Sequence, residues 1–348
     1  MKDQSPTKMP PTPTSSRPEP AARTPEWRIQ LREAIRDPDQ LIDRLGLPDA
    51  LRPGARRAAE RFAVVVPEPF LARMRHGDPD DPLLRQVLPL EEETVSAEGF
   101  DRDPVGDLEA RLSPGLIQKY HGRALLVVTG VCAVACRYCF RRHFPYHEGP
   151  ASLEAWEPAF RTVEADPSLE ELILSGGDPL MRDDAWLTRM IHRIDQIPHV
   201  RRIRVHTRLP IVIPDRVTEA LLETLTTSRC VVTVVVHANH PQELDAGCSS
   251  TLRSLVDRGI PVFNQAVLLR GINDSAEVQV ALSKRLLESK VTPYYLHQLD
   301  PVEGAAHFEV ETARGVAITD EVRGQLPGLG SPRYVRDDRS RHSKTPLQ

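Results

Sequence analysis

Runs of apolar and β-branched residues recur along the chain after residue 116 and alternate with amphipathic segments. Six runs fit buried strands, and the last five begin about 30 residues apart. The predicted strands are 124–129, 171–174, 202–206, 230–236, 261–268 and 291–296. Apolar residues at helical spacing fill the intervals, at 153–164, 184–197, 215–226, 249–257 and 275–288. This alternation predicts βα units with a parallel sheet, and six units in series favour a barrel or partial barrel.

The pattern divides the chain into four predicted parts. Residues 1–25 are rich in Pro, Ser and Thr, hold few large apolar side chains and are expected to be disordered. Residues 26–115 form a mainly helical accessory region, in which 77–115 carry many turn residues and resemble an extended wrap. The barrel follows at 116–300, and 301–348 form a C-terminal segment.

Composition narrows the class of protein. The chain has 348 residues, 40% of them hydrophobic, and a net charge of -4 that gives no basic field for nucleic-acid binding. No apolar run approaches the length of a membrane span, and the N-terminus lacks the apolar core of a signal peptide. Five cysteines, three of them crowded together, favour metal binding in a reducing compartment over disulfides. We therefore expect a cytoplasmic protein with no membrane or nucleic-acid partner.

Cys132, Cys136 and Cys139 follow directly on the first predicted barrel strand and can converge on one metal centre. The other two thiols, Cys230 and Cys248, are distant in sequence. A structural zinc site is one interpretation, but zinc prefers four protein ligands. Three thiolates leave one iron of a cubane cluster open for a ligand, so the triplet favours a catalytic iron–sulfur cluster.

Polar residues also follow the next predicted strands, whose C-terminal ends meet at one rim of a parallel barrel. Ser175, Gly176, Gly177 and Asp178 follow the second strand, and His206 ends the third. Taken singly, Gly-Gly-Asp can be an ordinary turn and a lone histidine a packed side chain. Their shared position at the strand ends favours a ligand site. The RGIND segment at 270–274 fits an Asx turn before the next helix, and composition alone indicates a frayed, charged C-terminal tail.

Several motifs together resemble the radical S-adenosylmethionine (SAM) superfamily, and more closely its lysine 2,3-aminomutase branch. The resemblance implies a partial (β/α)6 barrel of the radical SAM type. It rests on LLVVTGVCAVACRYCFRR, LILSGGDPL, RIRVHTRLP, HANHP, NQAVLLRGIND, EGAAHF and YVRD...SKTPL, in this order. The segments WRIQLREAIRDPDQLIDRLGL, DPLLRQVLP and FDRDPVGD resemble the subgroup that makes β-lysine for modification of elongation factor P.

The resemblance assigns the cluster and SAM to the first half of the barrel. It implies that Cys132, Cys136 and Cys139 bind a 4Fe-4S cluster whose open iron chelates SAM. The stretch from Ser175 through Gly176 and Gly177 to Asp178 would border the amino group of SAM. His206 would lie near its nucleoside.

The resemblance also implies a second cofactor, pyridoxal phosphate. Lys344 would form its Schiff base, while Lys119, Tyr120 and Arg123 would hold the cofactor and its phosphate. Lys119 stands where arginine is expected in the family. This exchange keeps the charge but loses the bidentate guanidinium fork.

The substrate implied by the resemblance is L-lysine. Arg141 would pair with its α-carboxylate, and Asp274 and Asp337 would receive its ε-ammonium. Two carboxylates aimed at one remote cation select lysine over glutamate, because a glutamate side chain would leave like charges unpaired in a desolvated pocket.

The implied reaction is a 2,3-migration of the amine, begun by a 5'-deoxyadenosyl radical that the reduced cluster generates from SAM. The implied partners are an electron donor such as flavodoxin or ferredoxin, and elongation factor P with its lysyl ligase. Arg-Ser-Arg-His-Ser precedes Lys344 in place of the glycine-rich approach of the catabolic aminomutases, which favours the elongation-factor subgroup. Three alternatives stay open: a catabolic L-lysine 2,3-aminomutase, a non-catalytic iron–sulfur or zinc module, and an interaction protein that uses its proline-rich N-terminus.

Overall fold

The protein, seen in a computed structural model, is described over residues 24–339, 341 and 343–347. The predicted disordered leader, residues 1–25, lies outside the described residues except for Thr24 and Pro25. In the described part of the chain, no helix is long and apolar enough to cross a membrane.

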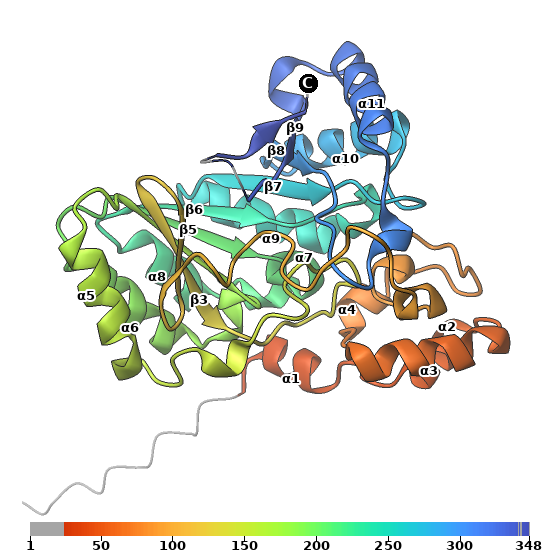
Figure 1. Ribbon diagram of the computed structural model, residues 1–348, viewed down its shortest axis with the longest axis horizontal. Coiled ribbons are helices and arrows are strands. Elements are labelled where there is room, and N and C mark those ends of the chain that lie inside the picture. Colours follow the sequence, from red (N-terminus) through yellow and green to blue (C-terminus); the bar gives the residue numbers. More distant parts are fainter. Residues whose placement is uncertain (1–23, 340, 342, 348) are drawn as a thin grey trace, which may run out of the picture.

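One sheet of ten strands, paired in chain order, organises the described residues (Figure 1). Strands β3 to β9 are parallel. At the two edges, β1 (Arg111–Ser113), β2 (Leu116–Tyr120) and β10 (Thr345–Pro346) run antiparallel to their neighbours. The parallel strands are β3 (Arg123–Thr129), β4 (Glu171–Gly176), β5 (Arg202–Thr207), β6 (Val231–Val236), β7 (Val262–Val267), β8 (Thr292–His297) and β9 (Arg333–Arg336). The six strands predicted from periodicity are confirmed, and β9 extends the parallel set by one.

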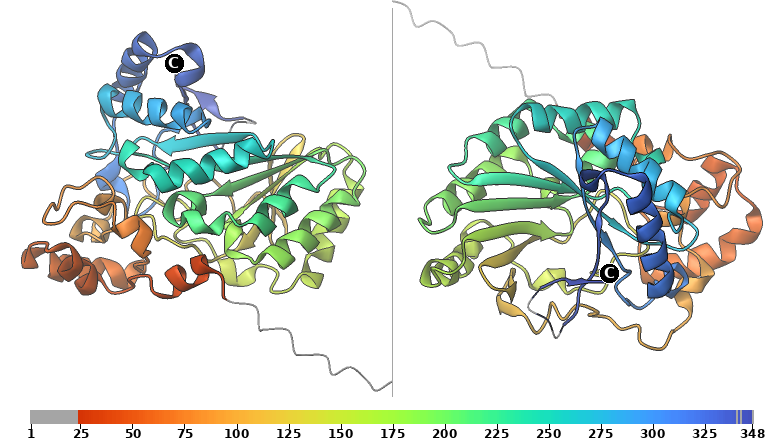
Figure 2. Two further views of the ribbon diagram at one scale, coloured as in Figure 1. Left: turned by 180° about the vertical axis from the view of Figure 1, so that it is seen from behind. Right: turned by 90° about the horizontal axis from the view of Figure 1, so that it is seen from above.

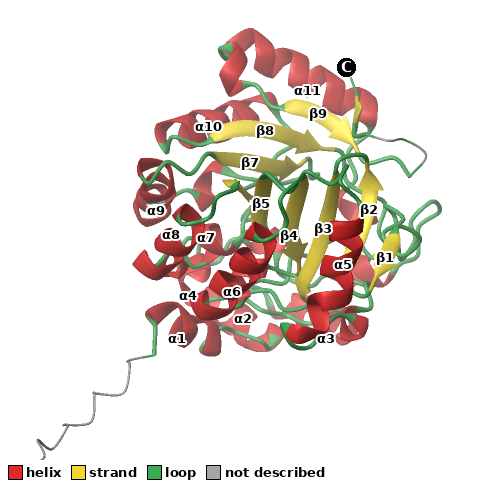
Figure 3. Cartoon of the chain, turned by 90° about the vertical axis from the view of Figure 1, so that its left-hand side faces the viewer, coloured by secondary structure: helices red, strands yellow, loops and turns green. Residues whose placement is uncertain are grey.

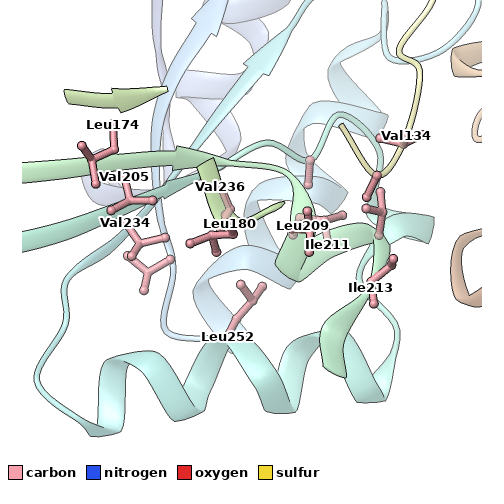
Figure 4. Close-up of a cluster of buried hydrophobic side chains, with 14 of the residues drawn as sticks. Val134, Leu174, Leu180, Val205, Leu209, Ile211, Ile213, Val234, Val236 and Leu252 are labelled. Atoms are coloured by element: carbon pink, nitrogen blue, oxygen red, sulfur yellow. The ribbon is translucent and has the colours of Figure 1, made fainter. Parts of the chain in front are cut away.

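The register of the sheet places buried side chains in rows across neighbouring strands. Leu126, Leu174, Val205 and Val234 pair in succession from β3 to β6, and all four are almost fully buried. Leu252 of helix α9 (Ala246–Asp257) belongs to the same hydrophobic core, and Figure 4 shows its side chain pointing from the helix toward Leu180. These contacts explain why continuous apolar runs, and not alternating ones, form the central strands.

Helices cover the outer face of the parallel strands (Figure 3). The main ones are α5 (Glu157–Ala165), α6 (Asp184–Asp195), α8 (Glu219–Thr226), α9 and α10 (Ala276–Glu288), close to the predicted intervals. The N-cap side chains of Asp183, Thr218, Asp245 and Ser275 each accept a hydrogen bond from a backbone N–H in the first turn of their helix. Local sequence therefore fixes where four of the covering helices begin.

The N-terminal region packs beside one end of the barrel (Figure 2). Its helices are α1 (Glu26–Arg32), α2 (Pro38–Leu45), α3 (Arg52–Arg61) and α4 (Glu68–Leu71), followed by the short 3₁₀ turns Leu84–Gln86 and Glu91–Thr94. Trp27 is buried, and the guanidinium of Arg216 lies 4.8 Å from the centre of its ring. The accessory region is thus tied to the barrel by its first helix.

The C-terminal segment is ordered into regular elements, which composition did not indicate. Helix α11 (Thr312–Gln325) leads into β9, and the short strand β10 (Thr345–Pro346) folds back on β9, where Thr345 pairs with Arg336. A periodicity reading does not detect this strand pair, because β9 has an arginine at each end and β10 is only two residues long. The pairing brings Lys344 back to the barrel.

Candidate active site

A cavity of about 500 Å³ lies inside the partial barrel. Residues of β2 (Leu116–Tyr120), β3, β4, β5, β7 and β8 line it, together with the loops that follow several of these strands, His237 after β6, and the C-terminal tail. All the site residues expected from the sequence except Asp274 contribute to this lining. They are Lys119, Tyr120, Arg123, Cys132, Cys136, Cys139, Arg141, Ser175, Gly176, Gly177, Asp178, His206, Asp337 and Lys344. One cavity therefore joins the cysteine triplet to a lysine more than 200 residues further along the chain.

The loop that carries the three cysteines is fixed by its backbone. Ala133 and Val134 are buried in the core, and the N–H of Ala135 donates to the carbonyl of Val65 at 3.1 Å. The N–H of Arg137 donates to the carbonyl of Gln86 at 2.9 Å. Both acceptors belong to the N-terminal region, so that region holds the cysteine loop in place.

The three cysteine thiols are free and partly exposed to the cavity. Burial, with the neighbouring sulfur atoms, raises the pKa of Cys132 well above its usual value and that of Cys139 to about 11. A guanidinium nitrogen of Arg208 donates to Sγ of Cys136 at 2.8 Å. Across the described residues, no three His, Cys, Asp or Glu side chains are close enough to hold a single metal ion.

Gly176 and Gly177 let the backbone of β4 approach the cysteine loop. Gly176 has a φ of +121°, and a Cβ there would lie 2.6 Å from the carbonyl oxygen of Thr129. A Cβ on Gly177 would lie 2.5 Å from the carbonyl oxygen of Val131. Sequence reasoning attributed these glycines to a ligand, whereas the structure shows that close packing between two backbone segments already requires them.

Asp178 ties the ends of β4 and β5 together. Its carboxylate accepts hydrogen bonds from the hydroxyl of Thr207 and from the backbone N–H groups of Leu180, Arg208 and Leu209, at 2.7 to 3.0 Å. Burial raises its pKa, and these hydrogen bonds oppose the rise. Most of the capacity of this carboxylate to accept hydrogen bonds is therefore used inside the protein.

Arg141 lines the cavity and belongs to a buried cluster of charges. Its Nε donates to Asp107 at 2.6 Å, its Nη1 donates to the hydroxyl of Ser175 at 3.1 Å, and Lys119 pairs with the second oxygen of Asp107 at 2.9 Å. Burial alone would raise the pKa of Asp107, but the two cations hold it below its usual value. Sequence reasoning missed Asp107, which lies in the irregular FDRDPVGD segment and carries no periodic signal.

The tail brings Lys344 to the part of the cavity wall that Tyr120 and Asp337 form, which we call the Lys344 end. Its Nζ donates to Asp337 at 2.6 Å, and the hydroxyl of Tyr120 donates to the other carboxylate oxygen of Asp337. Burial would raise the pKa of Asp337, but Lys344 and these hydrogen bonds hold it well below the usual range. The guanidinium of Arg123 lies 4.5 Å from the centre of the Tyr120 ring.

The structure places Asp274 outside the cavity. Its carboxylate accepts a hydrogen bond from the backbone N–H of Gly271, three residues earlier, at 3.0 Å, which closes a local turn. The expected Asx turn before the helix is not what the structure shows, because Ser275 caps helix α10. A different carboxylate, Asp300, lines the cavity just beyond β8. Burial and the neighbouring charge of Asp337 raise the pKa of Asp300 to about 7. Asp300 therefore joins Asp107, Asp178 and Asp337 in the lining of the cavity, and its position at a strand end was the available signal.

Three histidines line the cavity from neighbouring strands. His206 lies on β5, His237 follows β6 and His297 ends β8. Burial lowers the pKa of each ring, that of His237 to about 4, and the Nε2 atom of each is buried without a hydrogen-bond partner. Neutral rings with unsatisfied nitrogen atoms suit a polar ligand that completes their hydrogen bonds.

Comparison with known proteins finds similarity over most of the chain. A model of the radical SAM superfamily matches residues 126–247. The L-lysine 2,3-aminomutase of Escherichia coli strain K12 is 45% identical over 323 residues, which cover 92% of this chain and 94% of that protein. The L-lysine 2,3-aminomutase of Haemophilus influenzae is 39% identical over 319 residues, with the same coverage. Among solved structures, Streptococcus suis SuiB bound to S-adenosylmethionine matches with a TM-score of 0.47 and 13% identity, over 63% of this chain and 51% of that one.

Proposed function

Because the chain belongs to the lysine 2,3-aminomutase family of the radical SAM superfamily, we propose that it converts L-lysine into β-lysine. The reaction is an isomerisation: the amino group moves from Cα to Cβ, and one hydrogen atom moves from Cβ to Cα. The observation that carries the proposal is a single cavity with three free thiols at one end, and with Lys344, Asp337 and Asp300 at the other.

The residues around the thiols fit a 4Fe-4S cluster. Cys132, Cys136 and Cys139 face one cavity from one backbone-fixed loop, and three thiolates leave one iron of a 4Fe-4S cluster open for a ligand. When bound, the reduced cluster and SAM supply a radical that abstracts hydrogen from the substrate. The unsatisfied Nε2 atoms of His206 and His237 offer hydrogen-bonding sites for SAM in the same half of the cavity.

The residues at the other end fit pyridoxal phosphate, which supplies a carbonyl group that condenses with amines. Lys344 offers the amine, and Arg123 and Lys119 offer positive charge for a phosphate. Lys119 already pairs with Asp107, so Arg123 is the stronger candidate for the phosphate. Tyr120 would hold the cofactor end of the cavity through its hydrogen bond to Asp337.

The charges in the cavity fit the two ends of a lysine molecule. Arg141 is a buried cation suited to the α-carboxylate, and Ser175 and Asp107 fix its orientation. Asp337 and Asp300 provide the acidic pair for the ε-ammonium, with Asp300 in the place that sequence reasoning gave to Asp274. Two carboxylates around one ammonium select lysine against an acidic substrate, because burying an unpaired charge is strongly unfavourable.

The direct test is an anaerobic assay of the reconstituted protein with L-lysine, SAM, pyridoxal phosphate and dithionite, scored for β-lysine. Formation of β-lysine supports the proposal. A wild-type protein that carries both cofactors and yields no β-lysine would overturn it. Absence of SAM cleavage in the same sample would instead favour a non-catalytic iron–sulfur or zinc module.

We also propose that the product serves the modification of elongation factor P, in the cytoplasm, with a flavodoxin or ferredoxin as electron donor. The support is the resemblance of the N-terminal segments and of the tail before Lys344 to that subgroup. Deleting the gene tests this: loss of β-lysine from elongation factor P supports the link. Unchanged modification, with loss of growth on lysine, would support the catabolic alternative.

A further inference from the structure

We propose that Arg208 is a positioning residue for the iron–sulfur cluster, and that its hydrogen bond to the Cys136 sulfur makes the cluster easier to reduce. The proposal rests on the cluster site proposed above. It concerns the step before any lysine chemistry, since the cluster must accept an electron before SAM can be cleaved.

The Arg208 guanidinium is buried and aimed at the cysteine loop. Its side chain is 6% exposed, and its Nη1 donates both to Sγ of Cys136 at 2.8 Å and to the hydroxyl of Tyr138 at 2.6 Å. On the other side its Nη2 donates to Gln86 at 2.6 Å and to Glu243 at 3.0 Å. The guanidinium therefore bridges the sulfur of a cluster ligand and a buried carboxylate.

The surroundings hold this guanidinium in one orientation. Glu243 is fully buried, and its Oε1 accepts hydrogen bonds from the backbone N–H groups of Asn239 and His240 and from the side chain of Gln86. The backbone N–H of Arg208 is itself bound to Asp178 at 2.7 Å. Both the backbone and the far side of the guanidinium are fixed, so the N–H directed at Cys136 has little freedom to turn away.

The hydrogen bond from Arg208 should raise the reduction potential of the cluster. Reduction adds one negative charge to the cluster, and a cationic N–H donor stabilises the more negative state more strongly. Loss of this donor would make the cluster harder to reduce. Glu243 opposes the effect because its negative charge lies on the other side of the same guanidinium.

Two substitutions should therefore shift the reduction potential in opposite directions. Arg208→Gln removes the cation and should lower the potential, with at least a tenfold loss in the equilibrium constant for reduction, or about 59 mV for one electron. Glu243→Gln removes the opposing charge and keeps an oxygen for the backbone donors, so it should raise the potential. If Arg208 and Glu243 had only structural roles, the two substitutions would not shift the reduction potential in opposite directions.

Arg137, which lies in the cysteine loop, provides a matched control. It is fully buried, but its guanidinium donates to Glu93 and to the carbonyls of Phe62 and Ala63, and none of these hydrogen bonds reaches a sulfur. Arg137→Lys should destabilise the protein and leave the potential of any assembled cluster unchanged. Arg208→Lys keeps a charge near Glu243 but cannot reproduce the fork, so its potential should fall between those of wild type and Arg208→Gln.

The experiment is a redox titration of each reconstituted protein followed by electron paramagnetic resonance, with iron and sulfide contents measured on the same samples. Opposite shifts for Arg208→Gln and Glu243→Gln support the proposal. Shifts of the same sign, or none in fully loaded protein, overturn it. If Arg208→Gln assembles no cluster, Arg208→Lys and Glu243→Gln decide the question. Lysine is absent from the titration, so a wild-type failure to form β-lysine is a separate result that leaves the outcome for Arg208 standing.

Discussion

The two ends of the cavity are built in different ways. At the cysteine end, backbone hydrogen bonds from Ala135 and Arg137 to the N-terminal region fix a loop whose Ala133 and Val134 are part of the core. At the Lys344 end, side chains from distant segments meet, and their charges satisfy one another. The first end has its geometry before any ligand arrives, whereas the second must exchange internal partners for ligand groups.

Because of this difference, we expect mutations at the two ends to have different consequences. Asp337 is held by Lys344 and Tyr120, so it becomes available to a substrate ammonium when Lys344 is engaged elsewhere. Changes at this end should affect catalysis and substrate binding with little effect on folding. Changes that release the cysteine loop should affect stability first, because buried groups lose their partners.

The largest expected effect comes from Lys344→Ala. We expect β-lysine formation to fall by about 10³-fold or more, because the amine that would condense with pyridoxal phosphate is removed. The iron content and the thermal stability should stay close to those of wild type. The measurement is single-turnover β-lysine formation, with the visible absorbance of the bound cofactor recorded in parallel.

Lys344→Arg is the matched control for this prediction. It keeps a cation beside Asp337 but offers no amine of comparable reactivity, so its activity should also be lost. An arginine variant that retained a tenth of the wild-type activity would show that Lys344 acts through its charge alone.

The second prediction concerns the acidic pair. Asp337→Asn and Asp300→Asn should each lower kcat/KM for lysine by about 30-fold to 10³-fold, because the ε-ammonium would lose a buried charged partner worth about 2–4 kcal/mol. Asp274→Asn should stay within about twofold of wild type, since its hydrogen bond to Gly271 lies in a local turn. A larger loss of kcat/KM for Asp274→Asn than for Asp300→Asn would show that the ε-ammonium of lysine pairs with Asp274 and not with Asp300.

The sequence predicts features that depend on neighbouring residues better than features that depend on contacts between distant segments. The six central strands and the cysteine loop follow from continuous apolar runs and close spacing. Asp300 and Asp274 both follow predicted strands at similar distances, and periodicity cannot tell which of two such carboxylates turns inward. Asp107 and strand β9 depend on long-range contacts that leave no local pattern.

The third prediction compares a buried and an exposed carboxylate in the N-terminal region. Glu93 is almost fully buried and pairs with Arg137 and Arg142, so Glu93→Gln should lower the free energy of unfolding by about 3–5 kcal/mol. Glu91 pairs with Arg57 at the surface, and Glu91→Gln should cost about 0–1 kcal/mol. Unfolding of the cluster-free variants by a chemical denaturant measures both changes in the free energy of unfolding. Equal losses would mean that the buried pair does not hold the cysteine loop.

The smallest expected effect is a dependence of lysine binding on pH. Burial and Asp337 raise the pKa of Asp300 to about 7, so this carboxyl group is neutral below that pH and negative above it. The lysine ammonium is charged throughout this range and binds the negative form more strongly. The KM for lysine should therefore fall by roughly tenfold between pH 6 and pH 8, as the ionised fraction of Asp300 rises from about a tenth to about nine-tenths. Asp300→Asn should remove this dependence and leave a weaker, flat KM. A wild-type KM that stays constant over the same range would show that Asp300 is already ionised when lysine binds, and the lysine end of the cavity would then be as preformed as the cysteine end.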